Sequence, residues 1–357
     1  LTLLVHHIAA DGASLSLLMR QIAAALGGAV ADVADAAQGY ARHCRRQARM
    51  QREGRWRPQL AFWAEHLAGM PPLLELPSDF ARPPIAGRDG GVVRRRLAAA
   101  TATSVERMAA ACGATAFMVC AAAYQTLLAR YSGADDVFVG TAVSTRGHAA
   151  EDDVVGLFVN TLVLRTPVAQ DESFRAHLQR VRETCLSAYA HADVPFDDVV
   201  DAVRPARSMS HAPLVQAMIT MQPDVLADCR WPAGLHARWE PLHTGTAKFD
   251  LNLLITNGSD GLLLELEYRR DLFRPESAAA MLAQFAQLLE AAAAAPDTAL
   301  AALPMQSPED AAAAIAEALH AHRALPAGAC LHDRFSDVAM RQADAVAVSC
   351  AGEALSY

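Results

Sequence analysis

Apolar residues recur along this chain at two spacings, one typical of helices and one typical of strands. Between Ser14 and Leu26 they fall every three or four positions, which predicts a helix that Asp11 or Ser14 caps and Gly27 closes. Other helical runs lie at 42–57, 56–67, 104–111, 115–131, 174–190 and 278–294. Strand-like runs lie at 1–5, 137–143, 158–165, 217–221, 251–255 and 262–268. Interleaved helices and strands predict an α/β fold (α+β layered), in which helices pack in layers against a sheet.

Proline and glycine mark the main boundary in the chain. Five prolines and three glycines between residues 71 and 91 are incompatible with a helix there. We therefore predict a first lobe at 1–85, a second lobe at 86–300, an alanine-rich linker at 301–330 and the beginning of another unit at 331–357. Because the sequence opens directly in an apolar run and its last unit is short, we expect it to be a fragment at both ends.

The longest uncharged run, residues 108–129, has the length of a membrane span. Gly113 interrupts this run and Thr115 can cap a new helix, so we predict two buried helices and no membrane association. A net charge of −8 offers no basic field for nucleic acid. Seven cysteines without paired short spacings indicate neither a disulfide framework nor a metal site, which fits a cytoplasmic location.

Four residues that could take part in catalysis lie between the first strand-like run and the first helix. His6, His7, Asp11 and Gly12 fall on a predicted strand-to-helix loop, and such loops often carry catalytic groups. For an isolated pair of histidines, a hydrogen-bonded turn is the commoner interpretation. The remainder of the sequence has to decide between a simple turn and a catalytic loop.

Five further segments follow the histidine loop in the order that one enzyme family shows. They are Leu-Glu-Leu-Pro-Ser-Asp at 74–79, Val-Gly-Leu-Phe-Val-Asn-Thr-Leu at 155–162, His-Ala-Asp-Val-Pro-Phe-Asp at 191–197, Arg-Ser-Met-Ser-His-Ala-Pro-Leu at 207–214 and Lys-Phe-Asp-Leu at 248–251. With the HHxxxDG loop, the set resembles the condensation domains of non-ribosomal peptide synthetases. These belong to the superfamily of chloramphenicol acetyltransferase, so the resemblance implies two lobes of that type, the first of them incomplete.

The resemblance also implies a reaction. A donor acyl or peptidyl thioester and an acceptor aminoacyl thioester would be joined through an amide bond. Both would be carried on phosphopantetheine arms of upstream and downstream peptidyl carrier domains, so the chain itself would bind no cofactor. Residues 331–357 resemble the start of an adenylation domain in the same chain. With part of its substrate tunnel missing, the chain alone is expected to be inactive.

Within this resemblance, His7 is the principal catalytic candidate. An imidazole can accept a proton near neutral pH, so His7 can act as a general base, and it can equally act by holding the amine and thioester in register. His6 is expected to support the loop. The backbone N–H of Gly12 can donate to a developing oxyanion, or the glycine can serve the turn alone.

The resemblance assigns structural roles to three more residues. Asp11 is expected to form an ion pair with Arg146 rather than to act in a triad, and Asn160 is expected to line the tunnel or secure the lobe junction. Two departures from the family pattern stand out. Ala13 replaces a common aromatic residue, and the YxDYAVW segment is altered at 40–46.

Three other activities are compatible with the same fold. An acyl-CoA-dependent acyltransferase would act on a free small molecule, but the adenylation-like tail argues against it. A non-catalytic domain that recruits carrier domains or tailoring enzymes is disfavoured by the intact HHxxxDG loop. An epimerisation domain is disfavoured by the Pro-Phe-Asp sequence at 195–197, by the Lys-Phe-Asp-Leu sequence at 248–251 and by the tail.

Overall fold

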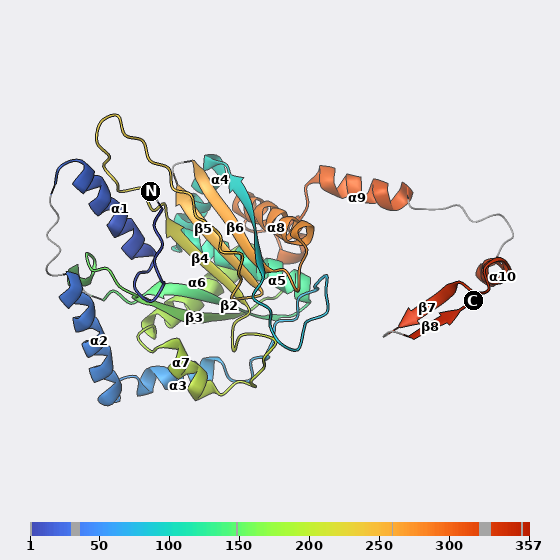
Figure 1. Ribbon diagram of the computed structural model, residues 1–357, viewed down its shortest axis with the longest axis horizontal. Helices are drawn as coiled ribbons and strands as arrows, with labels where there is room; N and C mark the ends of the chain where they lie inside the picture. The colour runs from blue at the N-terminus through green and yellow to red at the C-terminus, as the bar shows by residue number, and fades with distance from the viewer. Residues whose placement is uncertain (1, 30–35, 148, 259, 321–329, 351–352) are drawn as a thin grey trace. The chain divides into compact units, whose positions relative to one another are not determined.

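The computed structural model describes residues 2–29, 36–147, 149–258, 260–320, 330–350 and 353–357. The chain divides into two compact units, Leu1–Gln306 and Ser307–Tyr357. The first unit contains a six-stranded mixed sheet with helices packed on it, which confirms the predicted α/β fold (Figure 1). The division of this unit into lobes at residue 85 stays a prediction.

The sheet has the strand order β1-β6-β5-β4-β2-β3. The strands are β1 Gly90–Leu97, β2 Asp136–Ser144, β3 Val159–Pro167, β4 Ala217–Pro223, β5 Leu251–Gly258 and β6 Gly261–Arg269. The central pairs β2–β4 and β4–β5 are parallel, while the outer pairs are antiparallel. β1 was missed in the sequence because its arginines at 94–96 obscure the alternating pattern of an edge strand.

One face of the sheet is apolar and is covered by helices, while the face toward α1 carries polar side chains such as Asn252 and Glu267. On one face, Leu251, Leu253 and Leu266 meet Tyr124 and Phe285 from two helices, and all five side chains are buried. The helices that pack against the sheet are α4 Ala99–Ala111, α5 Ala116–Ser132, α6 Phe174–Ala190 and α8 Pro275–Ala294. Burying each large apolar side chain contributes about 1.5–3 kcal/mol, so this layer supplies much of the stability of the unit.

The uncharged run at 108–129 forms two helices, as predicted. α4 ends before Gly113, Thr115 caps α5, and the two helix axes are bent by 100°. Among the described residues, no single helix is long and apolar enough to cross a membrane, although this bent pair together meets a test of length and composition. In the folded unit, α5 is buried from residue 118 to residue 129.

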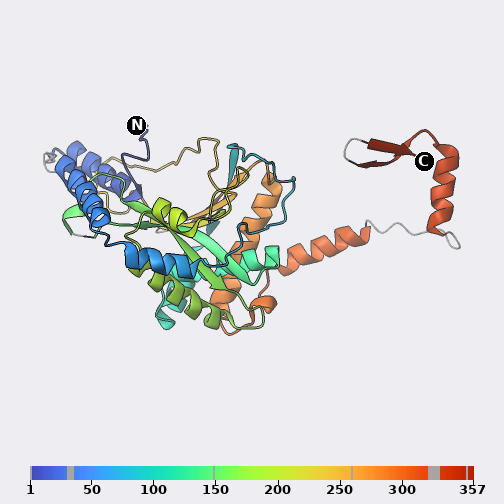
Figure 2. The same cartoon turned by 90° about the horizontal axis from the view of Figure 1, so that it is seen from below.

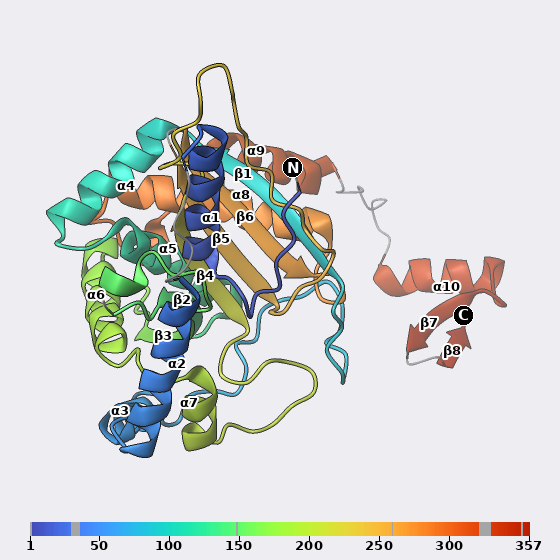
Figure 3. The same cartoon turned by 60° about the vertical axis from the view of Figure 1, so that its left-hand side comes forward.

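In the described part of the chain before β1, three helices precede the sheet: α1 Gly12–Leu26, α2 Ala36–Arg52 and α3 Arg57–His66. α3 packs against α7, Phe196–Val203, and the Trp63 indole N–H donates to the carbonyl of His191 (Figure 3). The long connection between β4 and β5 runs past the end of α1, near Gly27 (Figure 2). Two short 3₁₀ turns, Ala149–Glu151 and Leu300–Ala302, complete the unit.

One predicted strand is wrong. Residues 2–5 form no strand, because no described strand pairs with their backbone groups. In the second unit, the structure has helices α9 Pro308–His320 and α10 Leu331–Arg341 and the hairpin β7 Val346–Cys350 with β8 Glu353–Ser356. The assignment of residues 331–357 to the start of an adenylation domain stays a prediction.

Candidate functional site

Asp11 is the N-cap of α1 and fixes the start of the helix. Its Oδ1 accepts hydrogen bonds from the Ser14 backbone N–H at 2.8 Å and from the Ser14 hydroxyl at 2.7 Å. The Ser14 hydroxyl oxygen also accepts from the Gly156 N–H at 3.1 Å. Since Gly156 lies just before β3, the helix start is joined to a segment far away in the sequence.

Arg146 completes this junction. Its Nη2 lies 3.0 Å from Asp11 Oδ1 and 3.3 Å from Oδ2, and the two side chains are only 8% and 1% exposed. The guanidinium also donates to the Val154 carbonyl at 2.7 Å and lies 4.0 Å from the centre of the Phe158 ring. The predicted contact between Asp11 and Arg146 is therefore confirmed.

The environment of Asp11 keeps its carboxylate ionised. Burial alone would raise the pKa, but hydrogen bonds from the Ser14 hydroxyl, the Ser14 N–H and the Phe158 N–H, with the charge of Arg146, outweigh it and lower the pKa. The Phe158 N–H donates to Oδ2 at 3.1 Å. These partners hold the anion in place, and among the described residues Asp11 makes no hydrogen bond to His7.

The two histidines have different hydrogen bonds. His7 Nδ1 lies 3.0 Å from the Ala10 carbonyl oxygen, so the ring must carry its proton on Nδ1 to donate there. In the neutral ring, Nε2 then keeps its lone pair, and this edge of the exposed ring is the one available to a substrate. His6 Nδ1 instead accepts from the Ile8 N–H at 3.2 Å, which supports the turn.

A cavity of about 500 Å³ lies between the start of α1 and the polar face of the sheet. His7, Gly12 and Ser16 line it on the α1 side, and Asn252 and Glu267 line it on the sheet side. Figure 3 shows α1 in front of the sheet, on the side away from α8. The cavity brings His7, Asp11 and Gly12 together at one site.

Asn160 lies on β3 and does not line this cavity. Its amide nitrogen donates to the Ala192 and Val194 carbonyls at 2.8 and 2.6 Å, and its oxygen accepts from the Phe196 N–H at 3.0 Å. Asn160 thus holds the segment between α6 and α7, and through α7 it supports α3. Its expected role, to line the tunnel or to secure the lobe junction, stays a prediction.

The sequence matches the family described as "Condensation domain" over residues 1–314. The chain belongs to the condensation-domain family. A linear gramicidin synthase protein of Brevibacillus parabrevis is 34% identical over 358 residues, covering 99% of this chain and 7% of that protein. Surfactin synthase subunit 1 of Bacillus subtilis is 32% identical over 353 residues, with 99% and 10% covered. This condensation domain therefore spans a small part of the length of these relatives.

Solved structures give the same picture of the fold. The X-domain from teicoplanin biosynthesis superposes with a TM-score of 0.73 at 28% identity, covering 84% of this chain and 70% of that one. The first condensation domain of the CDA synthetase gives a TM-score of 0.70 at 23% identity, with 85% and 66% covered. These neighbours confirm the chloramphenicol acetyltransferase-like architecture that the HHxxxDG resemblance implied.

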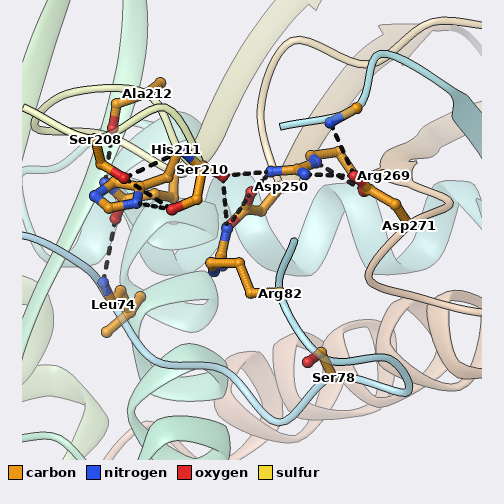
Figure 4. A network of polar contacts seen from close by, with 12 residues as sticks. Leu74, Ser78, Arg82, Ser208, Ser210, His211, Ala212, Asp250, Arg269 and Asp271 are labelled. Carbon is orange, nitrogen blue, oxygen red and sulfur yellow. Dashed lines mark hydrogen bonds and ion pairs between the residues drawn. The ribbon is translucent and has the colours of Figure 1, made fainter. Parts of the chain in front are cut away.

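A second buried ion network in the condensation domain was missed in the sequence. Asp250, which is 3% exposed, pairs with Arg82 and with Arg269, and Arg269 also pairs with Asp271 (Figure 4). Both arginines donate to the Ser210 carbonyl. The Lys-Phe-Asp-Leu motif indicated Asp250, but Arg82 lies in the proline-rich segment and carried no periodic signal. This network joins two of the family motifs, 207–214 and 248–251, at one point.

The altered segment at 40–46 forms a polar cluster. His43, which is buried, lies 3.1 Å from Glu151, and Arg46 donates to the same carboxylate at 3.1 Å. Burial raises the pKa of Glu151, but the hydrogen bonds from Gly147 and His43 and the charge of Arg46 outweigh it and lower the pKa. The cluster fixes the 3₁₀ turn whose Glu151 carbonyl accepts from Arg146. The departures therefore support the Asp11–Arg146 junction from α2.

One group among the described residues has the composition of a metal site: Cys330, His332 and Asp333. All three are exposed, and Cys330 and Asp333 already form the capping box of α10. Their contacts are explained by the helix cap.

Proposed function

We propose that this condensation domain joins a donor acyl or peptidyl thioester to an acceptor aminoacyl thioester through an amide bond during non-ribosomal peptide synthesis. The observation that carries the proposal is the exposed Nε2 edge of His7, whose ring orientation is set by the Ala10 carbonyl, in a cavity of about 500 Å³. The gramicidin and surfactin relatives are peptide synthases, which agrees with this chemistry.

The reaction forms a C–N bond and breaks a C–S bond. The neutral acceptor amine attacks the donor carbonyl, the tetrahedral intermediate expels the carrier thiolate, and the amine proton is passed on, ultimately to the thiolate. His7 Nε2 takes that proton as a general base, or orients the amine by accepting its hydrogen bond. A reactive thioester requires little further assistance, so both roles are compatible with the geometry of His7.

The start of α1 contributes to the same step. Gly12 is the first residue of the helix and lines the cavity, so its N–H and the helix dipole favour negative charge developing on the carbonyl oxygen. Asp11 and Arg146 act as positioning residues: they hold the helix start and the His7 loop against β3. His6 supports the same turn through the Ile8 N–H.

The substrates would arrive on phosphopantetheine arms of upstream and downstream peptidyl carrier domains, and no group on this chain would hold the arm covalently. An adenylation domain would follow in the same chain. Because carrier domains are loaded in the cytoplasm, this chain would act in the cytoplasm. Residues 1–85, 86–300, 301–330 and 331–357 would form the incomplete first lobe, the second lobe, the linker and the adenylation start. By itself this chain would be inactive.

The test is His7→Ala in the complete synthetase module that contains this chain. Removing the imidazole lowers the rate of dipeptidyl-carrier formation by roughly 100-fold or more, the contribution typical of a positioned general base. Loading of both carriers stays unchanged because it does not take place on this domain, and the unfolding midpoint stays unchanged because His7 is exposed. The matched control, His6→Ala, retains most of the activity. Near-normal condensation by His7→Ala would refute the assignment.

A further inference from the structure

The cavity that His7 lines also contains the one lysine of the sequence. Of 31 basic residues, 30 are arginine, and the remaining one is Lys248. Its side chain is exposed and lines the same cavity as His7 and Gly12. A lysine ammonium differs from a guanidinium in being a compact point charge on a flexible stem, so the two are not interchangeable in a binding site.

Lys248 makes no ion pair or hydrogen bond with any other residue that the structure describes. Four residues further on, the Asn252 side-chain amide lines the cavity and likewise has no partner among the described residues. Both groups donate hydrogen bonds, and both lie where the chain enters β5. The sheet side of the cavity therefore offers a free cation with a free amide donor beside it.

The acidic groups of the cavity are already occupied. Asp11 is neutralised by Arg146. Glu267 lies 3.2 Å from His243 Nε2, and the Gly245 N–H donates to His243 Nδ1, so Nε2 carries the proton and donates to Glu267. Glu267 therefore has its own donor and forms no ion pair with Lys248. Lys248 is left as the cation that an incoming anion meets.

We propose that Lys248 and Asn252 form a subsite for an anionic group of one of the two substrates. This inference rests on the proposed function, and it adds a contact that fixes the substrate on the side of the cavity opposite His7. Two parts of a carrier-bound substrate supply such an anion: the phosphate of the pantetheine arm and a carboxylate in the amino-acid side chain. Both are recognised by the same chemistry, a cation assisted by a neutral donor.

The single lysine makes a direct test available. Reductive methylation of the chain with ¹³C-formaldehyde labels Lys248 and the terminal amine alone, and it keeps the positive charge of lysine. The ¹³C signal of Lys248 is then followed during titration with four probes: phosphopantetheine, pantetheine, glutamyl-pantetheine and glutaminyl-pantetheine. This binding measurement does not depend on condensation activity.

We expect the Lys248 signal to shift with an anionic probe and not with its neutral counterpart. A shift with phosphopantetheine but not pantetheine identifies the arm phosphate as the bound group. A shift with glutamyl- but not glutaminyl-pantetheine identifies a side-chain carboxylate. No shift with either anionic probe, or equal shifts with the neutral ones, overturns the subsite, whereas the proposed function is judged separately by the His7→Ala assay.

Calorimetry then measures the affinity of variants for whichever anionic probe binds. Lys248→Gln and Asn252→Ala weaken the affinity, the former by roughly tenfold or more because it removes a charge-assisted hydrogen bond. Lys248→Arg retains the charge and recovers part of the affinity. The control is Arg107→Gln, which removes a positive charge from the exposed face of α4 outside the cavity and leaves the affinity unchanged. Equal affinity in Lys248→Gln and the unaltered chain contradicts the proposal.

Discussion

The residues at the start of α1 have two different roles: Asp11 fixes the structure of the loop, and His7 is available to a substrate. Asp11 is buried, accepts hydrogen bonds from several donors and pairs with Arg146, whereas His7 is exposed and has one bond through Nδ1. A carboxylate so fully occupied is suited to holding a loop, because arginine stays charged and keeps its partner ionised. The free edge of His7 is suited to meeting a substrate.

Asp11→Asn should damage the structure as well as the activity. The amide keeps the size of the side chain but loses the charge, which leaves Arg146 buried without its anion at a cost of about 3–5 kcal/mol. We expect a lower urea midpoint together with weaker condensation. Asp153→Asn is the control: it breaks an exposed pair with Arg20 and should change the midpoint little. A variant that unfolds like the unaltered chain but is inactive would indicate a chemical role for Asp11.

At the scale of elements, the packing between helices is mostly apolar but includes a few buried polar atoms without a hydrogen-bond partner among the described residues. α6 packs against α5 and β3, and its His177 is 0% exposed with both ring nitrogens unpaired among the described residues. The Glu172 carboxylate lies 3.7 Å from Nδ1, too far for a good hydrogen bond. Burial lowers the pKa of His177 to about 4, so the ring is neutral in the folded chain.

This histidine makes stability depend on pH. The folded pKa of about 4 lies below the usual 6.5, so as the pH falls through this window the unfolded chain gains a proton that the folded chain does not. The resulting loss of stability is on the order of 3 kcal/mol when complete. His177→Leu should raise the melting temperature at pH 7 and raise it more at pH 5. The exposed control, His236→Leu, should change neither value, and a lower melting temperature for His177→Leu would contradict the prediction.

At the scale of the whole molecule, the hydrophobic core of the first unit extends almost to the last residue of that unit. Leu300 and Leu303 are 0% and 2% exposed, and Arg130 donates to the Leu303 carbonyl. The second unit, Ser307–Tyr357, has its own helices and hairpin. The boundary of the folded condensation unit therefore lies after these leucines.

Two truncations should locate that boundary. A chain ending at Gln306 is expected to melt at the same temperature as the first transition of the longer chain, because it keeps both leucines. A chain ending at Ala299 loses them, at a cost of about 1.5–3 kcal/mol for each, and should melt lower by circular dichroism. If the chain ending at Gln306 melted as low as the one ending at Ala299, the second unit would be stabilising the first.

Much of this protein can be predicted from local sequence. Helical spacing identified α1, α5 and α6, and Thr115 and Asp11 act as the predicted caps, because these features depend on residues within one or two turns. The order of the motifs identified the family, and its known pattern led to the Asp11–Arg146 pair. The strand predicted at 1–5 failed because a strand exists only through a neighbour that pairs with it.

Only the tertiary structure decided which side chains share a cavity. Lys248, Asn252 and Glu267 line the same cavity as His7 because the pairing of β5 with β6 sets Asn252 opposite Glu267 and α1 lies over that face. Arg82 meets Asp250 across 168 positions of sequence. Such contacts follow from strand register and from the path of loops between layers, which depend on the packing of the whole unit and leave no periodic trace in the sequence.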